Sequence, residues 1–519
     1  MSRLLIFISL LSFSVFGQES DLPNVEPEKI YPLNKKIGNL NYRSQIDKSY
    51  YLFRDHIEAH SGIKPIIVSH IQTSQSFLPR YKKSIENHSG LLRLYPIADI
   101  TGGIMAGNTT SPTLVAGAGA GIDLHYKKFV FTAKALPYYS LQSGLLDSSQ
   151  SNFNQDYGTT RAIAPNIFLK SEILAAYKAN KFFTFWGGFG KNTFGEGYRS
   201  LLLSDNAGPS PFAKIETAFA GIKYVNLYSF LKDNTIDPFD RSLDIPKFTS
   251  THYLSWNITR SINISLFETV VWQRKDTLTN RGFDINYLNP IVFYRPVEYG
   301  LGSSDNVLIG ANSSYKFNNH HSIYGQFILD EFLLSELKAK SKWWANKYGY
   351  QLGYKSNHFF AENLYFQLEF NGVRPFTYSH KASQHAYGHM NAPLAHPIGA
   401  NFYEILNIIS YKKGKHRFTN KITMASYGAD TDNGISYGQD IFTSYSLRDG
   451  NFGHLMMQGV KTNVLNENFI YEYAIWPEID LYLIGAYNYR MANTSIGTTH
   501  AHTFSVGLKS RIWNSYSDF

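Results

Sequence analysis

The sequence predicts an all-β protein, a large antiparallel transmembrane β-barrel of about 18 strands. Three observations support this fold class. Runs of alternating apolar and polar residues recur along most of the chain. Aromatic residues make up 16% of it, with 37 Tyr and 37 Phe. Beyond the first 17 residues, no segment approaches the ~20 consecutive apolar residues that a membrane helix needs.

The clearest alternating run covers residues 364–371, which read Leu-Tyr-Phe-Gln-Leu-Glu-Phe-Asn. Its even positions are apolar and its odd positions can all hydrogen-bond, so a strand there has one apolar face and one polar face. In a soluble sandwich the apolar face would form the core, whereas in an outer-membrane barrel it contacts lipid and the polar face lines the lumen. The ends of the chain and the composition favour the barrel.

Residues 1–17 have the layout of a cleavable secretory signal peptide. Arg3 precedes an apolar run from Leu4 to Phe16 that only serines interrupt, and the small residue Gly17 follows. We therefore expect an exported protein with an N-terminal periplasmic segment at 18–88, for which a disordered leader is the alternative, and a barrel at 89–519. Cysteine is absent, which excludes disulfides, thiolate metal sites, lipoprotein anchoring and a Cys nucleophile.

The last part of the chain reads as a final membrane strand. In residues 503–513, Phe504, Val506 and Leu508 alternate with small or polar residues, and the chain ends at Phe519. An aromatic end on such a strand resembles the sorting signal of outer-membrane barrels. The tyrosines and phenylalanines at strand ends suit the aromatic girdles of such a barrel.

The net charge of +9 is spread over strands and turns, without a nucleic-acid-binding motif, so nucleic acid is not an expected partner. An anionic surface sugar or lipopolysaccharide is compatible with it.

Nineteen segments alternate in this way, and short turns between them alternate with long connections, as in bacterial barrels. An even number is expected when both chain ends lie in the periplasm, so either a strand near residues 439–446 is missing or the first segment is not part of the wall. The segments are 91–106, 114–125, 128–137, 168–178, 182–190, 212–219, 222–231, 250–259, 262–272, 305–316, 320–331, 346–355, 362–371, 401–411, 415–425, 454–464, 469–476, 480–490 and 503–513.

Two segments have compositions that are unusual for membrane strands, and we consider them candidate functional regions. Residues 187–211 are rich in glycine and contain a Ser-Asp-Asn run that can cap turns or bind sugar hydroxyls. Residues 374–404 carry His380, His385, His389 and His396, with Glu404 just after them. Imidazole and carboxylate suit zinc, but a loop that folds into the barrel mouth and is held there by hydrogen bonds is the favoured interpretation.

Strand periodicity places Gln326 and Asp330 on one face, which should point into the lumen, while Phe327 and Leu329 share the other. A buried carboxylate at Asp330 needs a cationic partner, for which Arg374 and Arg199 are candidates. The alternative is that these groups only plug and brace the barrel. We predict no catalytic residue, metal ligand or cofactor. The candidate ligand-binding residues are Arg199, Asp205, Asn206, Gln326, Asp330, Arg374, Tyr378, His380, His389, His396, Asn401 and Glu404.

From about residue 90 onward the chain resembles the capsule assembly protein Wzi family of outer-membrane barrels, in the Bacteroidetes form that includes RemB-like gliding motility proteins. The most specific pieces are the Leu-Leu-Leu-Ser-Asp-Asn-Ala-x-Pro-x-Pro segment at 201–211 and Tyr-Gly-Gln-x-x-x-Asp-Glu at 324–331, together with residues 305–310. The resemblance implies a lectin-like barrel that holds surface polysaccharide. The N-terminal region is shorter than a full helical bundle, and the family's sugar contacts cannot be transferred residue by residue.

The leading hypothesis is a non-enzymatic outer-membrane barrel whose outer loops bind or organise surface or capsular polysaccharide. The alternatives are a porin-like channel and a motility or secretion barrel with another envelope protein as partner. Bulky loop residues such as Trp343, Trp344, Phe376 and His389 indicate an occluded mouth, which disfavours a channel. A hydrolase is disfavoured, because no Gly-x-Ser-x-Gly motif stands on a strand-to-helix turn.

Overall fold

The computed structural model describes residues 42–43, 90–107, 110–142, 160–164, 166–233, 241–259, 261–275, 281–290, 305–318, 320–431, 433–495 and 497–513. The predicted signal peptide at 1–17, nearly all of the segment at 18–88 and the terminal Phe519 lie outside the described residues.

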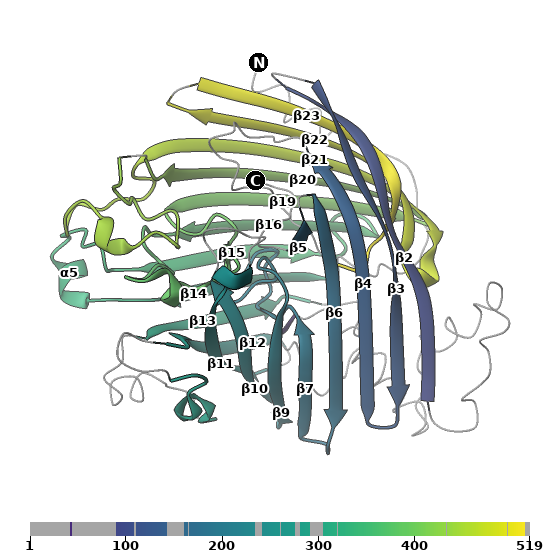
Figure 1. Cartoon of the computed structure of the whole chain (residues 1–519), viewed down its shortest axis with the longest axis horizontal. Helices are drawn as coiled ribbons and strands as arrows, with labels where there is room; N and C mark the ends of the chain where they lie inside the picture. Colours follow the sequence, from purple (N-terminus) through teal and green to yellow (C-terminus); the bar gives the residue numbers. More distant parts are fainter. Residues whose placement is uncertain are drawn as a thin grey trace.

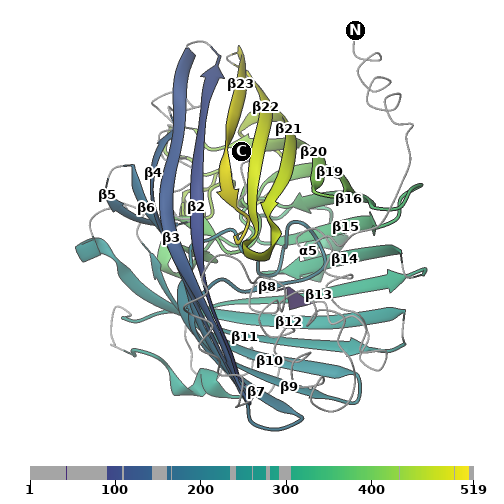
Figure 2. The same ribbon diagram turned by 90° about the vertical axis from the view of Figure 1, so that its right-hand side faces the viewer.

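The described residues form a closed antiparallel barrel with eighteen strands in its wall (Figures 1 and 2). Each wall strand pairs with the next along the chain, and β23 pairs with β2 to close the ring, with Leu508 opposite Ile100. The strands are β2 (Gly90–Ala106), β3 (Thr110–Tyr126), β4 (Phe129–Gln142), β6 (Ile167–Lys178), β7 (Phe183–Gly190), β9 (Ser210–Phe219), β10 (Ile222–Asp233), β11 (Ile245–Asn257), β12 (Ile262–Gln273), β13 (Asn306–Lys316), β14 (His321–Leu329), β15 (Tyr348–Ser356), β16 (Leu364–Val373), β19 (Phe402–Lys413), β20 (His416–Ala429), β21 (Val460–Trp476), β22 (Leu481–Thr494) and β23 (Gly497–Ser510).

The remaining elements are short. They are β1 (Tyr42–Arg43), which pairs with β8 (Thr193–Phe194), β5 (Arg161–Ala164) beside the start of β6, the hairpin of β17 (Gly388–His389) and β18 (Ala392–Pro393), helix α5 (Leu334–Lys338), and the 3-10 turns η2 (Arg241–Leu243), η3 (Ile285–Leu288), η4 (Ser383–His385), η5 (Tyr445–Leu447) and η6 (Pro477–Ile479). None of the described helices is long and apolar enough to cross a membrane.

The predicted strand number of about 18 is confirmed, and the structure explains the nineteenth segment. Segments 454–464 and 469–476 were expected as two strands, but residues 460–476 form the single strand β21. Asn466 and Asn468, which read as a turn in the sequence, are buried inside the barrel instead. Both explanations that the sequence offered for the odd number are wrong. Residues 439–446 lie in a connection and form no extra strand, and the first segment is wall strand β2.

The two faces of β16 follow the alternation seen in the sequence. Its odd-numbered residues, including Gln367, Glu369 and Asn371, are buried in the lumen. On the other face Leu368 is 44% exposed. The prediction of one polar and one apolar face is therefore confirmed for this strand.

Large exposed apolar side chains cover the outside of the wall. They occur on each of the eighteen wall strands, whereas a soluble monomer exposes contiguous apolar surface of only a few hundred Å². Neighbouring examples are Ile100 and Ile104 on β2 with Phe504 and Val506 on β23. A closed barrel with an apolar exterior and a polar interior is built to sit in a bilayer, so the chain is an outer-membrane β-barrel protein.

The two ends of the barrel differ in the length of their connections. At one end, turns as short as residues 127–128 and 220–221 join the strands. At the other, long connections span residues 330–347, 374–401 and 430–459. Bacterial barrels place short turns in the periplasm and long loops outside, so we call these the periplasmic and the outer end.

Candidate functional site

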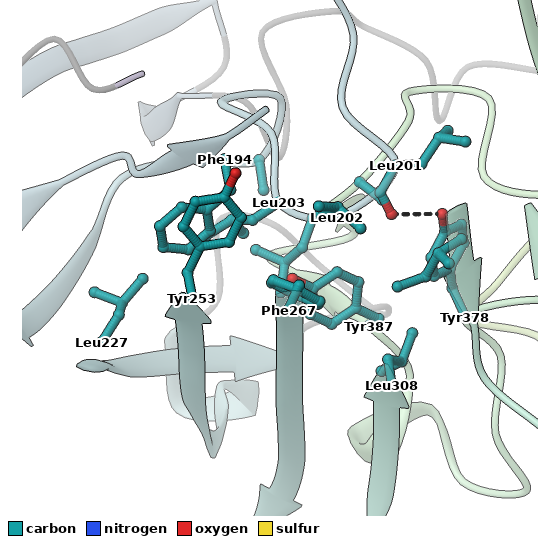
Figure 3. Close-up of a cluster of buried hydrophobic side chains, with 14 of the residues drawn as sticks. Phe194, Leu201, Leu202, Leu203, Leu227, Tyr253, Phe267, Leu308, Tyr378 and Tyr387 are labelled. Atoms are coloured by element: carbon teal, nitrogen blue, oxygen red, sulfur yellow. Dashed lines mark hydrogen bonds between the residues drawn. The ribbon is translucent and has the colours of Figure 1, made fainter. Parts of the chain in front are cut away.

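A connection from the outer end fills part of the lumen. Residues 191–209, here called the plug segment, leave β7, fold inward and return to β9. Its Leu201 and Leu202 are completely buried. They belong to one apolar cluster with lumen-facing side chains of the wall, including Phe267 on β12 and Leu308 on β13 (Figure 3). The apolar triplet at 201–203 folds inward because the lumen there offers it an apolar surface.

The loop at residues 374–401, here called the histidine loop, packs on the plug segment. The hydroxyl of Tyr378 donates to the carbonyl of Leu201 at 2.8 Å (Figure 3). The hydroxyl of Ser204 donates to the carbonyls of Leu394 and Ala395. The plug segment and the histidine loop therefore form one packed body at the outer end.

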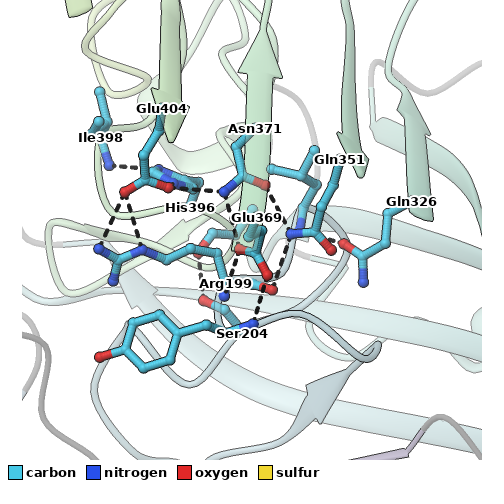
Figure 4. A network of polar contacts seen from close by, with 12 residues as sticks. Arg199, Ser204, Gln326, Gln351, Glu369, Asn371, His396, Ile398 and Glu404 are labelled. Carbon is cyan, nitrogen blue, oxygen red and sulfur yellow. Dashed lines mark hydrogen bonds and ion pairs between the residues drawn. The ribbon is translucent and has the colours of Figure 1, made fainter. Parts of the chain in front are cut away.

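Glu369 on β16 binds the plug backbone. Its carboxylate accepts hydrogen bonds from the backbone N–H groups of Tyr198 at 2.7 Å and Arg199 at 3.1 Å. The Tyr324 hydroxyl also donates to it at 2.7 Å. The Asn371 amide donates to it at 3.0 Å (Figure 4). A completely buried carboxylate is costly unless it is hydrogen-bonded in this way, so the four donors offset its burial.

Glu404 on β19 pairs with the plug segment directly. A guanidinium nitrogen of Arg199 lies 3.3 Å from one carboxylate oxygen. The other oxygen lies 2.7 Å from Nε2 of His396 in the histidine loop and accepts from the Asn371 amide at 2.8 Å (Figure 4). The wall, the plug segment and the histidine loop thus meet at one buried carboxylate.

Gln326 on β14 contacts the next part of the plug. Its side-chain oxygen accepts from the backbone N–H of Leu201 at 2.8 Å. Lys355 on β15 forms a buried ion pair with Glu196. The predicted lumen orientation of Gln326 and of Asp330 holds, since both are buried while Phe327 is exposed on the outside.

The predicted partner of Asp330 was wrong. Its carboxylate lies 3.5 Å from the amine of Lys347 and accepts from the backbone N–H of Tyr378 at 2.8 Å. Arg199 pairs with Glu404 instead, and Arg374 lies over the ring of Tyr348, 5.6 Å from its centre. Lys347 is next to Asp330 because the backbone ladder of β14 and β15 continues through these two residues, with a 3.0 Å hydrogen bond.

Other predicted residues also connect the loops. The Asn206 amide donates to the carbonyl of Pro393 at 3.0 Å, and the Asn401 amide to that of Gly428 at 2.8 Å. The amine of Lys191 donates to the carbonyl of Asp205 at 3.0 Å. Burial lowers the pKa of Lys191 to about 8.

The four histidines of the histidine loop do not converge. Among the described residues, no group of three or more His, Asp or Glu side chains is placed to hold a metal ion. The ring centres of His380 and His385 are 5.0 Å apart, His389 accepts from the backbone N–H of Lys232 at 3.0 Å, and His396 contacts Glu404. This arrangement fits the favoured interpretation, in which the loop folds into the mouth and is held by hydrogen bonds.

Two of these histidines are buried as neutral rings. Burial, with a smaller contribution from His385, lowers the pKa of His380 to about 3. Burial, with Lys247 nearby, lowers that of His389 to about 4. Both imidazoles are therefore uncharged at neutral pH.

Aromatic side chains close the mouth beside the histidine loop. Trp344 and Phe376 are buried with their rings at right angles, and the guanidinium of Arg448 lies 3.9 Å from the centre of the Trp344 ring. The backbone N–H of Trp344 donates to Asn451, which joins residues 330–347 to residues 430–459.

One sequence match carries no catalytic arrangement. Residues 434–438 read Gly-Ile-Ser-Tyr-Gly, which has the spacing of a nucleophile elbow, but they form an outer-loop turn rather than a strand-to-helix turn. The hydroxyl of Ser436 lies 3.5 Å from the carboxylate of Asp430. A serine nucleophile needs an adjacent base such as histidine, and no described histidine bonds to this hydroxyl.

Sequence reasoning missed Glu369, Asn371 and Lys347 as site residues. Glu369 and Asn371 lie on the polar face of the alternating run at 364–371, so their inward direction was already visible. Their partners were not, because these come from the plug segment about 170 residues earlier. Direct contact of the twelve candidate residues with a ligand stays a prediction.

Comparisons with known proteins assign the chain to no family. No family model and no curated protein matches it. Among solved structures it is similar to Wzi of Escherichia coli, described as an outer-membrane protein involved in group 1 capsule assembly and a carbohydrate-binding β-barrel (TM-score 0.46, 11% identity, 79% of this chain and 84% of that one). It is also similar to OprD (0.41, 12%, 81% and 94%) and OccK1 (0.44, 10%, 80% and 97%) of Pseudomonas aeruginosa. Structural similarity with TM-scores and identities this low assigns no family. The fold assignment therefore rests on the chain's own strand pairing.

Proposed function

We propose that this protein is a non-enzymatic, Wzi-like barrel that binds surface or capsular polysaccharide at the outer end. The observation that carries the proposal is the plug segment, tied to the wall through Glu369 and Glu404. A lumen that is partly filled by a fixed segment is poorly suited to the passage of large solutes. A rigid outer surface, in contrast, binds at a lower cost in ordering its side chains.

The binding surface in this proposal is an exposed apolar patch on the outer loops. Phe452 is 60% exposed, and Phe332 is exposed on the neighbouring connection. We call it the outer patch; it consists of Phe332, Leu333, Leu334, Leu337, Leu447, Phe452 and Leu455. Exposed apolar clusters of this kind mark interaction sites, and aromatic rings can stack on the apolar faces of sugars.

The outer patch is held by the loops beneath it. Residues 330–347 and 430–459 are joined by backbone hydrogen bonds from Trp344 to Asn451 and from Gly453 to Ser341. The partly buried Trp343 packs against Trp344 at the centre of this junction. In this proposal the twelve candidate residues act mainly by holding the plug segment and the outer loops in place. A glycan contacts the outer patch.

A second candidate is a motility or secretion barrel whose partner is an envelope protein. The leucines in the outer patch favour it, because aliphatic side chains suit a protein surface better than a sugar. The two candidates predict different cellular defects.

A chromosomal deletion tests the proposal in cells. We expect loss of polysaccharide retained at the surface, measured by capsule staining, and rescue by the wild-type gene but not by Phe452→Ala. The matched control is Phe360→Ala, since Phe360 is 91% exposed at the periplasmic end. Normal capsule together with lost spreading on agar would instead support the protein-partner candidate.

A further inference from the structure

The lumen is not filled evenly. On the side of β9 to β19, wall residues that meet the plug segment, such as Glu369 and Glu404, are buried. On β23, inward side chains such as Thr503 and Ser505 stay partly exposed, and the side chain of Lys509 is 31% exposed. Among the described residues, the inward face of β23 is therefore less covered than the wall that meets the plug segment.

Arg490 on β22 points into this side of the barrel. It shares the inward face with Tyr482 and Ile484, whereas Leu483 is exposed on the outside. Asn466 lies opposite it on β21, and Asn488 precedes it by two residues on the same face. Arg490 is only 7% exposed.

No described residue forms a hydrogen bond or ion pair with the Arg490 guanidinium, and its Nε is buried without a partner. Other arginines of the lumen have acidic neighbours. Arg199 pairs with Glu404 at 3.3 Å, and Arg511 pairs with Glu472 at 2.9 Å. Arginine is almost never buried unless it is paired, so Arg490 is an exception that needs an explanation.

The groups around Arg490 are neutral hydrogen-bonding groups. The Asn488 amide donates to the Asn466 side chain at 2.6 Å. Thr423 on β20 lies in the same row, opposite Asn466, and its hydroxyl is also buried without a hydrogen-bond partner. The guanidinium of Arg490 thus shares a row of the wall with one hydroxyl and two amides, groups that can hydrogen-bond to an anion.

We propose that Arg490 is the centre of a lumenal binding site for a carboxylate. The planar guanidinium fork matches the two oxygens of a carboxylate. A single positive charge among neutral groups suits one negative charge better than a doubly charged phosphate. The hydroxyl of Thr423 and the amides of the row would hydrogen-bond further oxygens of the same ligand.

This site is separate from the outer patch, so it does not depend on the proposed function. The carboxylate can belong to a free sugar acid or to a uronate unit of a polysaccharide, because both present the same planar group. Monomeric and polymeric probes distinguish the two sources.

The experiment is isothermal titration calorimetry of the purified full chain in detergent. The ligands are glucuronate, polygalacturonate and glucose, each titrated separately. We expect the wild type to bind at least one of the two uronate probes and to prefer it to glucose. Arg490→Gln should weaken that binding by about tenfold or more, as loss of a charge-assisted hydrogen bond does, and Arg490→Lys should retain part of it. Binding of the monomer identifies a free acid as a sufficient ligand, and binding of the polymer alone identifies a polysaccharide unit.

The control is Lys461→Gln, which removes one positive charge from an exposed position on β21 and should leave binding unchanged. Thr423→Val keeps the arginine and should weaken binding less, which provides a second readout if Arg490→Gln does not fold. Unchanged uronate binding in folded Arg490→Gln, equal binding of glucose by the wild type, or no binding of either uronate would overturn the proposal.

Discussion

Arg199 in the plug segment and Glu404 in the wall strand β19 form a fully buried ion pair, with 3.3 Å between a guanidinium nitrogen and a carboxylate oxygen. The pair joins a segment from one side of the barrel to a strand on another. His396 of the histidine loop contacts the same carboxylate at 2.7 Å. The plug segment and the histidine loop should therefore loosen together when Glu404 is changed.

We predict that Glu404→Gln destabilises the plug by about 3–5 kcal/mol, because it leaves the buried Arg199 guanidinium without its charge partner. Limited proteolysis of the reconstituted barrel should show faster cleavage in residues 191–209. Lys232→Met is the control, since Lys232 pairs with Asp244 at the surface and exposed pairs contribute little. Equal cleavage in Glu404→Gln and wild type would contradict this role.

Leu202→Ala should cost about 2–5 kcal/mol, because it leaves a cavity in the apolar cluster between the plug segment and the wall. A lower thermal unfolding temperature in detergent, or faster proteolysis in residues 191–209, would show this loss of stability. Leu352→Ala should have a much smaller effect on the plug, since Leu352 faces outward and is 64% exposed. The account of the plug is wrong if both substitutions act alike.

The histidine loop should loosen in acid. The pKa values of His380 and His389 are lowered to about 3 and about 4, below the usual value of 6.5. As the pH falls below 6.5, the released loop binds protons that the packed loop does not, so packing loses stability until the pH reaches about 4 for His389 and about 3 for His380. The hydrogen-exchange protection factors of residues 374–401, which are corrected for the intrinsic pH dependence of exchange, should fall over this range.

His389→Gln should reduce that pH dependence, since it removes one of the two groups that take up a proton. Protection factors that do not change between pH 7 and pH 4 in the wild type would contradict the lowered pKa values of His380 and His389.

Removing the plug should open the lumen. A variant that lacks residues 196–207 loses the contacts to Glu369 and Glu404, and we expect a several-fold higher conductance in planar bilayers than for the wild type. The wild type should pass small ions poorly or in small steps, because the plug segment and the histidine loop fill part of its lumen. A wild-type conductance as large as that of the deletion variant would instead support the porin-like alternative.

The sequence predicted the wall better than the interior. Strand β16 could be predicted because Gln367, Glu369 and Asn371 alternate with apolar residues, and this periodicity is a local property. Strand β21 was split because its inward Asn466 and Asn468 read as a turn, although both are buried in the lumen and Asn466 accepts a hydrogen bond from the Asn488 amide. Periodicity alone cannot distinguish these two situations.

The partners within the site could not be predicted because they are distant in the sequence. Asp330 pairs with Lys347 through the continuation of one strand ladder, and Glu369 binds the backbone of Tyr198 and Arg199. Nothing near Glu369 in the sequence indicates that the plug segment would return to it. Only the closed barrel brings these segments together.

Binding of the organism's own isolated surface polysaccharide to the purified protein tests the proposed function most directly. We expect the wild type and Phe360→Ala to bind it equally in a co-sedimentation or calorimetric measurement, and Phe452→Ala combined with Phe332→Ala to lose most of that binding. A folded wild-type barrel that binds no polysaccharide would contradict the proposal.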